Sequence, residues 1–575
     1  MLNKESIQVL LFLTIVLALV KPVGIYIYHV LENKPCFLDK LISPIERFVY
    51  KVCGIDNTSS MDWKKYLYCM LFFNMIGMLW VYFVLRLQSF LPFNPEHFAN
   101  VSPDLAFNTA ASFVSNTNWQ AYSGESTLSY FSQMTGLTVQ NFLSSATGLA
   151  LFAAFVRGIR KNNTNSLGNY WVDMTRGILY ILLPLAFIFA VFLTSQGVIQ
   201  NLKPYQKATL IQSTIDIETK EPVTEQIIPM GPVASQVAIK QIGTNGGGFF
   251  NTNSAHPFEN PNIISNFFEM LAIILLPAAL CYTYGIMVRD RKQGIAVLIA
   301  MLMLFIPMML ILIAAEHQIT PTFQQMEVIG TGNMEGKETR FGITNSTLWT
   351  SLTTATSSGS VNSMLDSYTP IGGAAALWLM HLGEVTFGGL GSGLYGMLMI
   401  IIVTVFGTGL MVGRTPEFLG KKIEPYEMKM ASITVLFMPL LVLLLTSIAS
   451  VLPSGTNSIT NPGPHGFTQI LYAITSACNN NGSSFEGLVT NTNFYNIVTG
   501  VAMLLSRYWV AIPLLATAGA LAKKKISPPN AGTLPTVAPL FIVLIVADTL
   551  LIGALSFFSV LSLGPIAEYF MLWGQ

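Results

Sequence analysis

Long apolar runs alternate with polar connections along the whole chain. Ten runs are long enough to cross a membrane core of about 30 Å, which takes roughly 20 helical residues. They lie near residues 7–30, 67–85, 130–156, 177–193, 263–288, 295–315, 371–412, 433–452, 494–521 and 537–560. This pattern predicts an all-α integral membrane protein with about ten transmembrane helices.

Four of the connections contain a short helix-like stretch and then a polar loop rich in Asn, Ser, Thr and Gly. The loops begin at Ser115, Gly243, Ser357 and Cys478, and each is followed by another apolar run. A span, a re-entrant helix, a loop and a second span form the unit of an ion-channel filter, because irregular backbone at membrane depth survives only in a wet cavity or buried in protein. The chain is therefore predicted to carry four span-pore-span repeats.

The repeats divide the chain into six segments. Residues 1–65 are expected to form an extra span with a cytoplasmic loop, and residues 527–575 an extra C-terminal span. The four pore repeats are assigned to residues 66–160, 161–292, 293–425 and 426–526.

Positive charge predicts the orientation of the spans, since cytoplasmic connections retain Lys and Arg. Basic residues gather in every odd-numbered connection, for example at Arg157, Arg160 and Lys161, and are sparse in the even-numbered ones. We therefore expect both termini outside and all four polar loops entering from the outer face.

The composition narrows the functional classes. Charged residues make up 10% of the chain, against about 25% in soluble domains, and hydrophobic residues make up 52%. The net charge is +1 without a basic run, which gives no indication of nucleic-acid binding. Five dispersed cysteines form no Cys-x-x-Cys pair, so neither a disulfide framework nor a zinc site is indicated.

The loops have the residue types of a filter for an alkali cation. A dehydrated cation needs several oxygens at once, and backbone carbonyls held by a pore helix supply them. Gly permits the dihedral angles that turn carbonyls toward an axis, and Asn is the next most tolerant residue. Each loop alone is also compatible with a simple turn between helices; four on one face favour a filter. The candidates are Ser115, Asn116, Thr117, Asn118, Gln120, Gly243, Thr244, Asn245, Gly246, Ser357, Ser358, Gly359, Cys478, Asn479, Asn480, Asn481 and Gly482.

Two features modify this filter. The first loop has no glycine where the others have Gly246, Gly359 and Gly482, so Asn116 to Asn118 must serve there and the ring is expected to be asymmetric. An acidic residue follows each loop, and an outer ring of these carboxylates would concentrate cations at the mouth, although acids on a surface are common. The four acids are Glu125, Glu259, Asp366 and Glu486.

Several stretches resemble one known family. They are Asn116–Gln120 with Ser123–Ser126, Gly243–Asn251 with His256–Pro261, Gly383–Gly389, Gly413–Glu417 and Cys478–Gly482. They are similar to the potassium-binding A subunits (KdpA) of the bacterial Kdp potassium-transporting ATPases, and the similarity runs from end to end. That family belongs to a wider group of potassium transporters built from four span-pore-span repeats.

The resemblance implies a function and partners. The ion would be potassium, bound through backbone carbonyls, with Gln120 determining selectivity and affinity. A P-type ATPase catalytic subunit (KdpB) would bind ATP and Mg, beside a single-span accessory subunit (KdpC) and a small subunit (KdpF). No covalent cofactor is expected, and the location would be the bacterial plasma (inner) membrane.

Ionisable residues within spans are costly and are functional candidates. Glu384 lies in the seventh run beside Gly388 and Gly389, a glycine density that predicts a broken helix and a gate; close helix packing is the alternative. Arg507, in the ninth run, would place a charge below the ions, or pair with a buried acid such as Asp548. Arg414 is either a topology charge or a switch facing a partner subunit.

Three functional classes come into question, and one of them, an intramembrane enzyme, would need a nucleophile and base or a metal cluster within the spans, which the sequence does not indicate. The favoured function is the potassium-binding, channel-like subunit of an ATP-driven uptake pump. The alternative is a self-sufficient potassium channel or ion-coupled carrier of the same repeat group. The chain contains no Asp-Lys-Thr-Gly phosphorylation sequence, so we expect no catalytic residues in it and place the ATPase activity on a partner.

Overall fold

Ten long apolar helical stretches dominate the described part of the chain, as the hydropathy pattern predicts. The structure is a computed structural model that describes residues 4–215, 220–328, 330, 332–383, 385–528 and 533–574. Among these residues, the ten stretches are Lys4–Leu31, Trp63–Arg86, Ser132–Arg160, Tyr170–Ser195, Ile263–Met287, Arg291–Gln325, Ser392–Met411, Pro425–Val451, Asn493–Lys523 and Pro539–Leu563. The all-α membrane fold is therefore confirmed.

Each of four modules places a short helix between two spans. The first has α3 (Trp63–Arg86), the short α4 (Pro103–Val114), π-helical η2 (Ser132–Thr138) and α6 (Val139–Arg160). The second has α7 (Tyr170–Arg176), π-helical η3 (Gly177–Leu182), α8 (Leu183–Ser195), the short α9 (Val233–Ile242) and α10 (Ile263–Met287). The third has α11 (Arg291–Glu316), the short α13 (Gly342–Ala355), α14 (Pro370–His381) and α15 (Ser392–Met411). The fourth has α16 (Pro425–Val451), the short α18 (Pro464–Asn479) and α19 (Asn493–Lys523).

The second span of the third module is interrupted. Instead of one helix over residues 371–412, α14 ends at His381 and α15 starts at Ser392. Gly383, Gly388 and Gly391 in the connection all have positive φ, which removes them from the helical region. The glycine density therefore breaks the span where the sequence predicts it.

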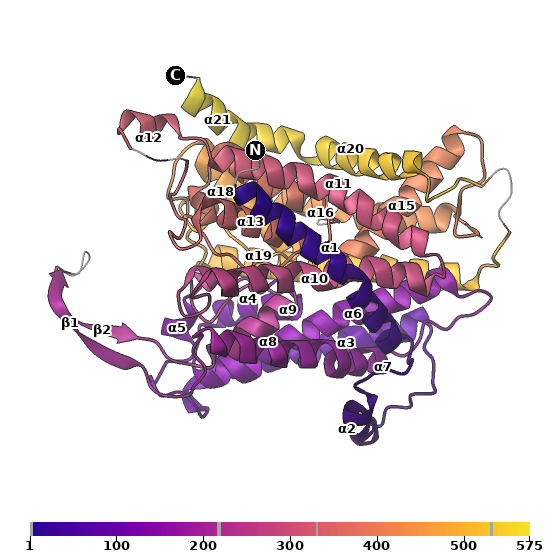
Figure 1. The fold of residues 1–575 in the computed structure, drawn as a ribbon, viewed down its shortest axis with the longest axis horizontal. Coiled ribbons are helices and arrows are strands. Elements are labelled where there is room, and N and C mark those ends of the chain that lie inside the picture. Colours follow the sequence, from indigo (N-terminus) through magenta and orange to yellow (C-terminus); the bar gives the residue numbers. More distant parts are fainter. Residues whose placement is uncertain are drawn as a thin grey trace.

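The remaining elements surround this core. α1 (Lys4–Leu31) packs along α10, and α20 (Pro539–Leu563) packs against α11 and α15. The amphipathic α2 (Asp39–Cys53) lies at one end of the molecule; the hairpin of β1 (Gln206–Ile215) and β2 (Pro222–Ile228), which the hydropathy pattern did not predict, lies at the other (Figure 1). Antiparallel pairs join Gln206 with Ile228 at its base. Short elements complete the chain: η1 (Gln88–Phe90), α5 (Gly124–Thr127), η4 (Asn253–Ala255), α12 (Pro321–Gln325), η5 (Leu365–Ser367), β3 (Glu417–Phe418), β4 (Lys421–Lys422), α17 (Pro453–Thr456) and α21 (Pro565–Trp573).

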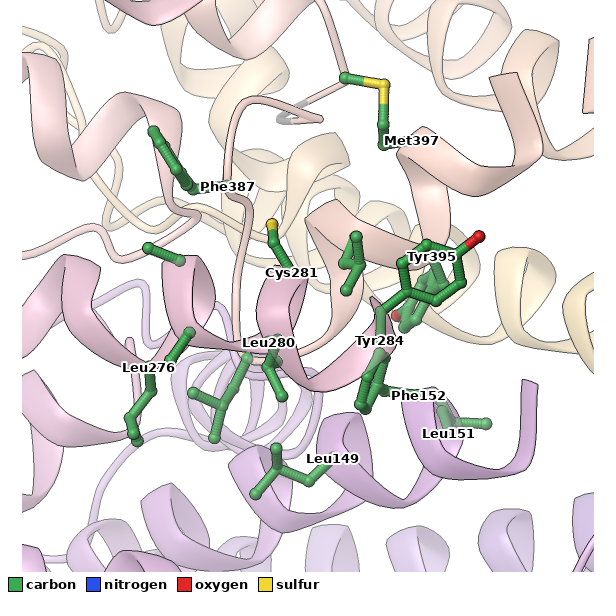
Figure 2. Packing of buried hydrophobic residues seen from close by; sticks show 14 of the residues in the cluster. Leu149, Leu151, Phe152, Leu276, Leu280, Cys281, Tyr284, Phe387, Tyr395 and Met397 are labelled. Carbon is green, nitrogen blue, oxygen red and sulfur yellow. The ribbon is translucent and has the colours of Figure 1, made fainter. Parts of the chain in front are cut away.

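The largest hydrophobic core lies where the modules meet. Leu280, Cys281 and Tyr284 of α10 lie between Leu149 and Phe152 of α6 on one side and the broken span on the other (Figure 2). These five side chains are fully buried, and most α6 side chains are buried as well. A span buried on nearly every face is typical of the centre of a bundle, and α6 therefore forms an inner wall rather than a lipid-facing surface.

Candidate functional site

The four polar loops close into one ring. Three of the four predicted filter glycines lie so close to a neighbouring loop that an added Cβ atom would meet one of its backbone carbonyl oxygens. The pairs are Gly246 with Thr117 and Ser358, Gly359 with Asn481, and Gly482 with Thr117. The first loop therefore touches the second and the fourth, and the third lies between those two. For Gly246 both oxygens would be 2.9 Å from the Cβ atom, a distance that only a residue without a side chain tolerates.

The loops share a backbone conformation that follows the pore helices. The residues at matching positions have φ near +60°: Asn116 (68°), Thr244 (52°), Ser357 (52°) and Asn480 (55°). Left-handed φ is uncommon outside glycine and is found mostly in Asn and Asp. In the first loop Asn118 stands where the others have a glycine and also has positive φ, at 57°. The first loop thus lacks the glycine, and Asn118 adopts the positive φ that Gly359 (75°) and Gly482 (104°) have in the third and fourth loops, whereas Gly246 of the second loop does not have positive φ.

Side-chain amides fasten the first loop to the second. The Asn245 amide donates to Asn116 Oδ1 at 2.8 Å and Asn118 Oδ1 at 3.1 Å, and the Asn116 amide donates to the Thr244 carbonyl at 3.1 Å. Ser145 of α6 donates to the Gly243 carbonyl at 2.8 Å. Ser145 was not predicted, because a serine inside an apolar span carries no signal of a filter contact in the sequence alone.

The fourth loop is fastened to the first in the same way. The Asn480 amide donates to Thr117 Oγ1 at 3.0 Å and to the Met503 carbonyl at 2.9 Å. Asn480 follows α18, whereas Cys478 and Asn479 belong to the last turn of that helix. These hydrogen bonds hold the fourth loop against the first.

Gln120 clamps the second loop from above the ring. Its amide nitrogen donates to the Gly248 carbonyl at 3.2 Å, and its Oε1 accepts from the Gly248 amide at 2.9 Å. Gln120 also lines a vestibule of about 600 Å³, together with Asn118, Gly359 and Gly482. This side chain therefore positions a filter loop and borders the entry to the ring.

The four acids do not form an exposed ring around this vestibule. Glu486 lines it and accepts a hydrogen bond from the Leu365 amide at 3.0 Å. Glu125 is half-buried and accepts from the Asn251 amide at 3.0 Å, and burial raises the pKa of its carboxyl group. Glu259 is 0% exposed, and its carboxylate forms an ion pair with Lys240 of the second pore helix.

Asp366, the last of the four acids, is buried beside His465. His465 lies between Asp366 Oδ1, at 3.1 Å, and Glu568 Oε1 of α21, at 2.9 Å. Burial lowers the pKa of the His465 imidazole, but hydrogen bonds to the two carboxylates outweigh this effect and raise it to about 10. Asp366 therefore joins η5 to α18, whereas His465 joins α18 to α21, and Asp366 does not line the vestibule.

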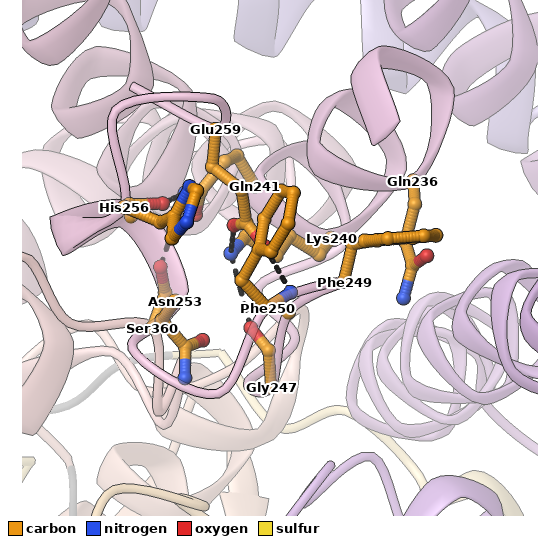
Figure 3. A network of polar contacts seen from close by, with 12 residues as sticks. Gln236, Lys240, Gln241, Gly247, Phe249, Phe250, Asn253, His256, Glu259 and Ser360 are labelled. Atoms are coloured by element: carbon orange, nitrogen blue, oxygen red, sulfur yellow. Dashed lines mark hydrogen bonds and ion pairs between the residues drawn. The ribbon is translucent and has the colours of Figure 1, made fainter. Parts of the chain in front are cut away.

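Lys240 and Glu259 form a fully buried ion pair behind the second loop (Figure 3). Lys240 Nζ lies 2.6 Å from Glu259 Oε2 and also donates to the Gly247 carbonyl at 3.0 Å. Glu259 Oε1 accepts from the Phe250 amide at 2.9 Å, and the Phe250 ring stacks on His256. The sequence contains a signal for this pair, because a lysine in a pore helix must find a buried partner.

Helix ends give the ring a negative potential without a carboxylate. The helices α4, α9, α13 and α18 all end at the loops, and a helix C-terminus carries a partial negative charge. Among the described residues, no group of three or more His, Cys, Asp or Glu side chains could hold a metal ion. The oxygen atoms at the ring therefore belong to carbonyl, hydroxyl and amide groups, which suit a large monovalent cation.

The interrupted span lies directly against the inner side of the ring. The Gly388 amide donates to the Ala355 carbonyl at 2.9 Å, and the Leu390 amide donates to Thr244 Oγ1 at 3.0 Å. A Cβ atom on Gly389 would lie 3.4 Å from Ser357 Cβ. The segment therefore touches two filter loops. Glu384 lies outside the described residues.

A cavity of about 120 Å³ borders the ring at the third and fourth loops. Arg507 of α19 lines it together with Ser357, Asn479 and Asn480. Among the described carboxylates, Asp548 included, none forms an ion pair with Arg507. Its positive charge thus faces the space below the ring. Arg414 lies beyond the end of α15 and is half-buried.

Comparison with known proteins shows the family to which this chain belongs. The model of the family described as "KdpA: Potassium-transporting ATPase A subunit" matches residues 10–570. The chain belongs to this family. It is 53% identical to the potassium-transporting ATPase potassium-binding subunit of Methylococcus capsulatus over 588 residues, which cover 99% of both chains. It is 54% identical to the subunit of the same description from Sorangium cellulosum over 571 residues, which cover 98% of both.

One solved structure that aligns with this chain is the crystal structure of the potassium transporter TrkH from Vibrio parahaemolyticus. The two chains align with a TM-score of 0.48 and 13% sequence identity, over 86% of this chain and 96% of that one.

Proposed function

We propose that this chain binds potassium in the ring of four loops and passes it inward as the channel-like subunit of an ATP-driven potassium uptake pump. Its relatives are described as potassium-binding subunits of a potassium-transporting ATPase. The observation that carries the proposal is the closed contact of the loops, with backbone carbonyls at every junction and four helix C-termini directed at it. Carbonyl oxygens in such a ring replace the hydration shell of the ion.

The proposed path has three parts. Potassium enters the vestibule beside Gln120 and Glu486, is bound in the ring, and reaches the cavity that Arg507 lines. The fixed charge of Arg507 raises the energy of an ion in the cavity and opposes free outflow. The segment that holds Gly388 and Gly389 acts as the gate, since it lies between ring and cavity.

The energy for uptake comes from partner subunits. A P-type ATPase catalytic subunit (KdpB) binds ATP and Mg, and the subunits KdpC and KdpF complete the complex. The complex lies in the bacterial inner membrane, with the pore loops and both termini of this chain on the outer side. Copurification of the tagged chain with an ATPase in fixed ratio tests this assignment; a functional chain that transports potassium alone would contradict it.

A matched pair of glycine variants tests the ring itself. In Gly482→Ala the new Cβ atom would collide with the Thr117 carbonyl oxygen, whereas in Gly407→Ala no atom lies within 4 Å of the new methyl group. We expect Gly482→Ala to lose potassium-stimulated ATPase activity in an assembled complex, and Gly407→Ala to retain it. Equal activity of the two variants would remove the ring from the transport path.

A further inference from the structure

A third cavity, apart from the two that border the ring, lies among the connections between the spans. It encloses about 730 Å³ and is lined by residues from all five connections that carry the basic residues. The first connection supplies Glu32 and residues 57–60, and the fifth, seventh and ninth supply Arg289, Leu419 and Ile526. The third connection supplies Lys161, Asn162, Ser166, Gly168 and Asn169. The filter and its vestibules contribute nothing to it.

Two of the arginines that line this cavity are occupied by structural contacts. Arg157 donates to Asp173 at 2.7 Å and to the Leu31 carbonyl at 2.6 Å. Arg176 pairs with Glu46 at 2.9 Å. These contacts hold the two side chains in the wall of the cavity, and the positive charge of each is neutralised by a carboxylate.

Three further cationic side chains that line the cavity have no carboxylate partner of their own. Arg160 shares Glu32 with Arg157, so two guanidinium groups contact one carboxylate. Lys161 donates only to Ser166, at 3.2 Å to the hydroxyl and 3.3 Å to the carbonyl, and it pairs with no described carboxylate. Arg289 also forms no ion pair with a described residue. Burial, and then the charge of Arg157, lower the pKa of the Lys161 amine, although the charges of Glu32 and Asp173 oppose this shift.

Neutral donors complete the wall of the cavity. Hydroxyl and amide side chains line it at residues 57–60 and at Asn162, Ser166 and Asn169. Excess positive charge with several neutral donors is the arrangement that binds phosphate oxygens. Leu31, Val288, Leu419 and Ile526 add apolar surface. The cavity also lies at the ends of α1, α6 and α10, where phosphate groups of a bilayer would be found.

We propose that this cavity binds a phosphate-bearing anion, with Lys161 and Arg289 as its charged ligands and Arg160 as a third contact. The phosphate group belongs either to an anionic lipid or to a soluble phosphate monoester. Binding fastens the five connections to one another, because each supplies part of the lining. This site is separate from the potassium filter and does not depend on the proposed function.

The test uses the purified complex in an uncharged detergent and a phosphate-free buffer. Calorimetric titration with dihexanoyl-phosphatidylglycerol reports the lipid source, and titration with glycerol 3-phosphate reports the soluble source. The test variant is Lys161→Gln/Arg289→Gln. The control is Lys523→Gln/Lys525→Gln, which removes the same charge from exposed positions in the same part of the molecule. Unfolding temperatures without ligand confirm that both variants fold.

We expect saturable binding of at least one probe, weakened about tenfold or more in the test variant and unchanged in the control. Binding of the lipid alone would assign the phosphate to a membrane lipid, and binding of both would show that the phosphate is sufficient. The proposal is overturned if neither probe binds to the wild-type complex, or if the test and control variants bind with equal affinity.

Discussion

Replacement of Lys240 by Met would leave one carboxylate buried without its partner. Lys240 and Glu259 side chains are 1% and 0% exposed, and Lys240 Nζ lies 2.6 Å from Glu259 Oε2. Removing one member of a buried pair costs about 3–5 kcal/mol, because the remaining charge cannot be solvated. The lost hydrogen bond to the Gly247 carbonyl adds about 1 kcal/mol. We therefore expect Lys240→Met to lower the free energy of unfolding by about 4–6 kcal/mol.

Two controls isolate the buried charge. Lys207 of the β1–β2 hairpin pairs with Glu225 at 3.4 Å, but its side chain is 71% exposed. Lys207→Met should cost less than about 1 kcal/mol, as exposed pairs do. In Lys240→Met/Glu259→Gln no charge stays buried and the acceptor for Phe250 is kept, so much of the stability should return.

Equilibrium denaturant titration in detergent, followed by tryptophan fluorescence, measures these differences. Because Gly247 belongs to the second loop, we also expect the ratio of rubidium to potassium transport to change in the single variant. The reasoning is refuted if Lys240→Met is as stable as Lys207→Met, or if the double variant is as unstable as the single one.

Three further variants test other parts of the site. Gln120→Arg places a cation beside the ring and breaks the clamp on Gly248, so the apparent potassium affinity should fall by about tenfold or more in ATPase assays; an unchanged affinity would mean that the charge does not reach the ions. Arg507→Met removes the charge below the ring but keeps much of the side-chain length, and it should allow passive potassium flux in vesicles without ATP; wild-type flux and coupling would leave Arg507 a structural role. Because the pKa of His465 is raised to about 10, the stability that its link between α18 and α21 contributes should be fully present below about pH 6.5 and should fall by about 2–3 kcal/mol as pH rises to 10, and His465→Gln should remove this pH dependence of stability.

The spans and the four loops could be predicted because a bilayer limits the structures that apolar and polar segments of a chain can adopt. A long apolar run has few alternatives to a spanning helix, and a polar loop between two such runs must line a cavity or be buried. The break between α14 and α15 was predictable for a similar reason, since clustered glycines around Gly388 cannot sustain a helix.

The roles of individual charges could not be predicted from position alone. Glu259 and Glu486 each follow a filter loop, yet one is buried against Lys240 and the other faces the vestibule. The difference depends on the direction in which each side chain leaves its loop, and an isolated acidic residue does not show that direction. The β1–β2 hairpin was missed because its side chains are mostly exposed and form no apolar run.

Ion density in the assembled complex tests the central claim most directly. A high-resolution structure with rubidium in place of potassium should show density inside the ring, coordinated by carbonyl oxygens of all four loops, Thr117, Asn245, Ser358 and Asn481 among them. Density confined to the vestibule near Glu486, with none between the loops, would contradict the assignment of the ring as the potassium site.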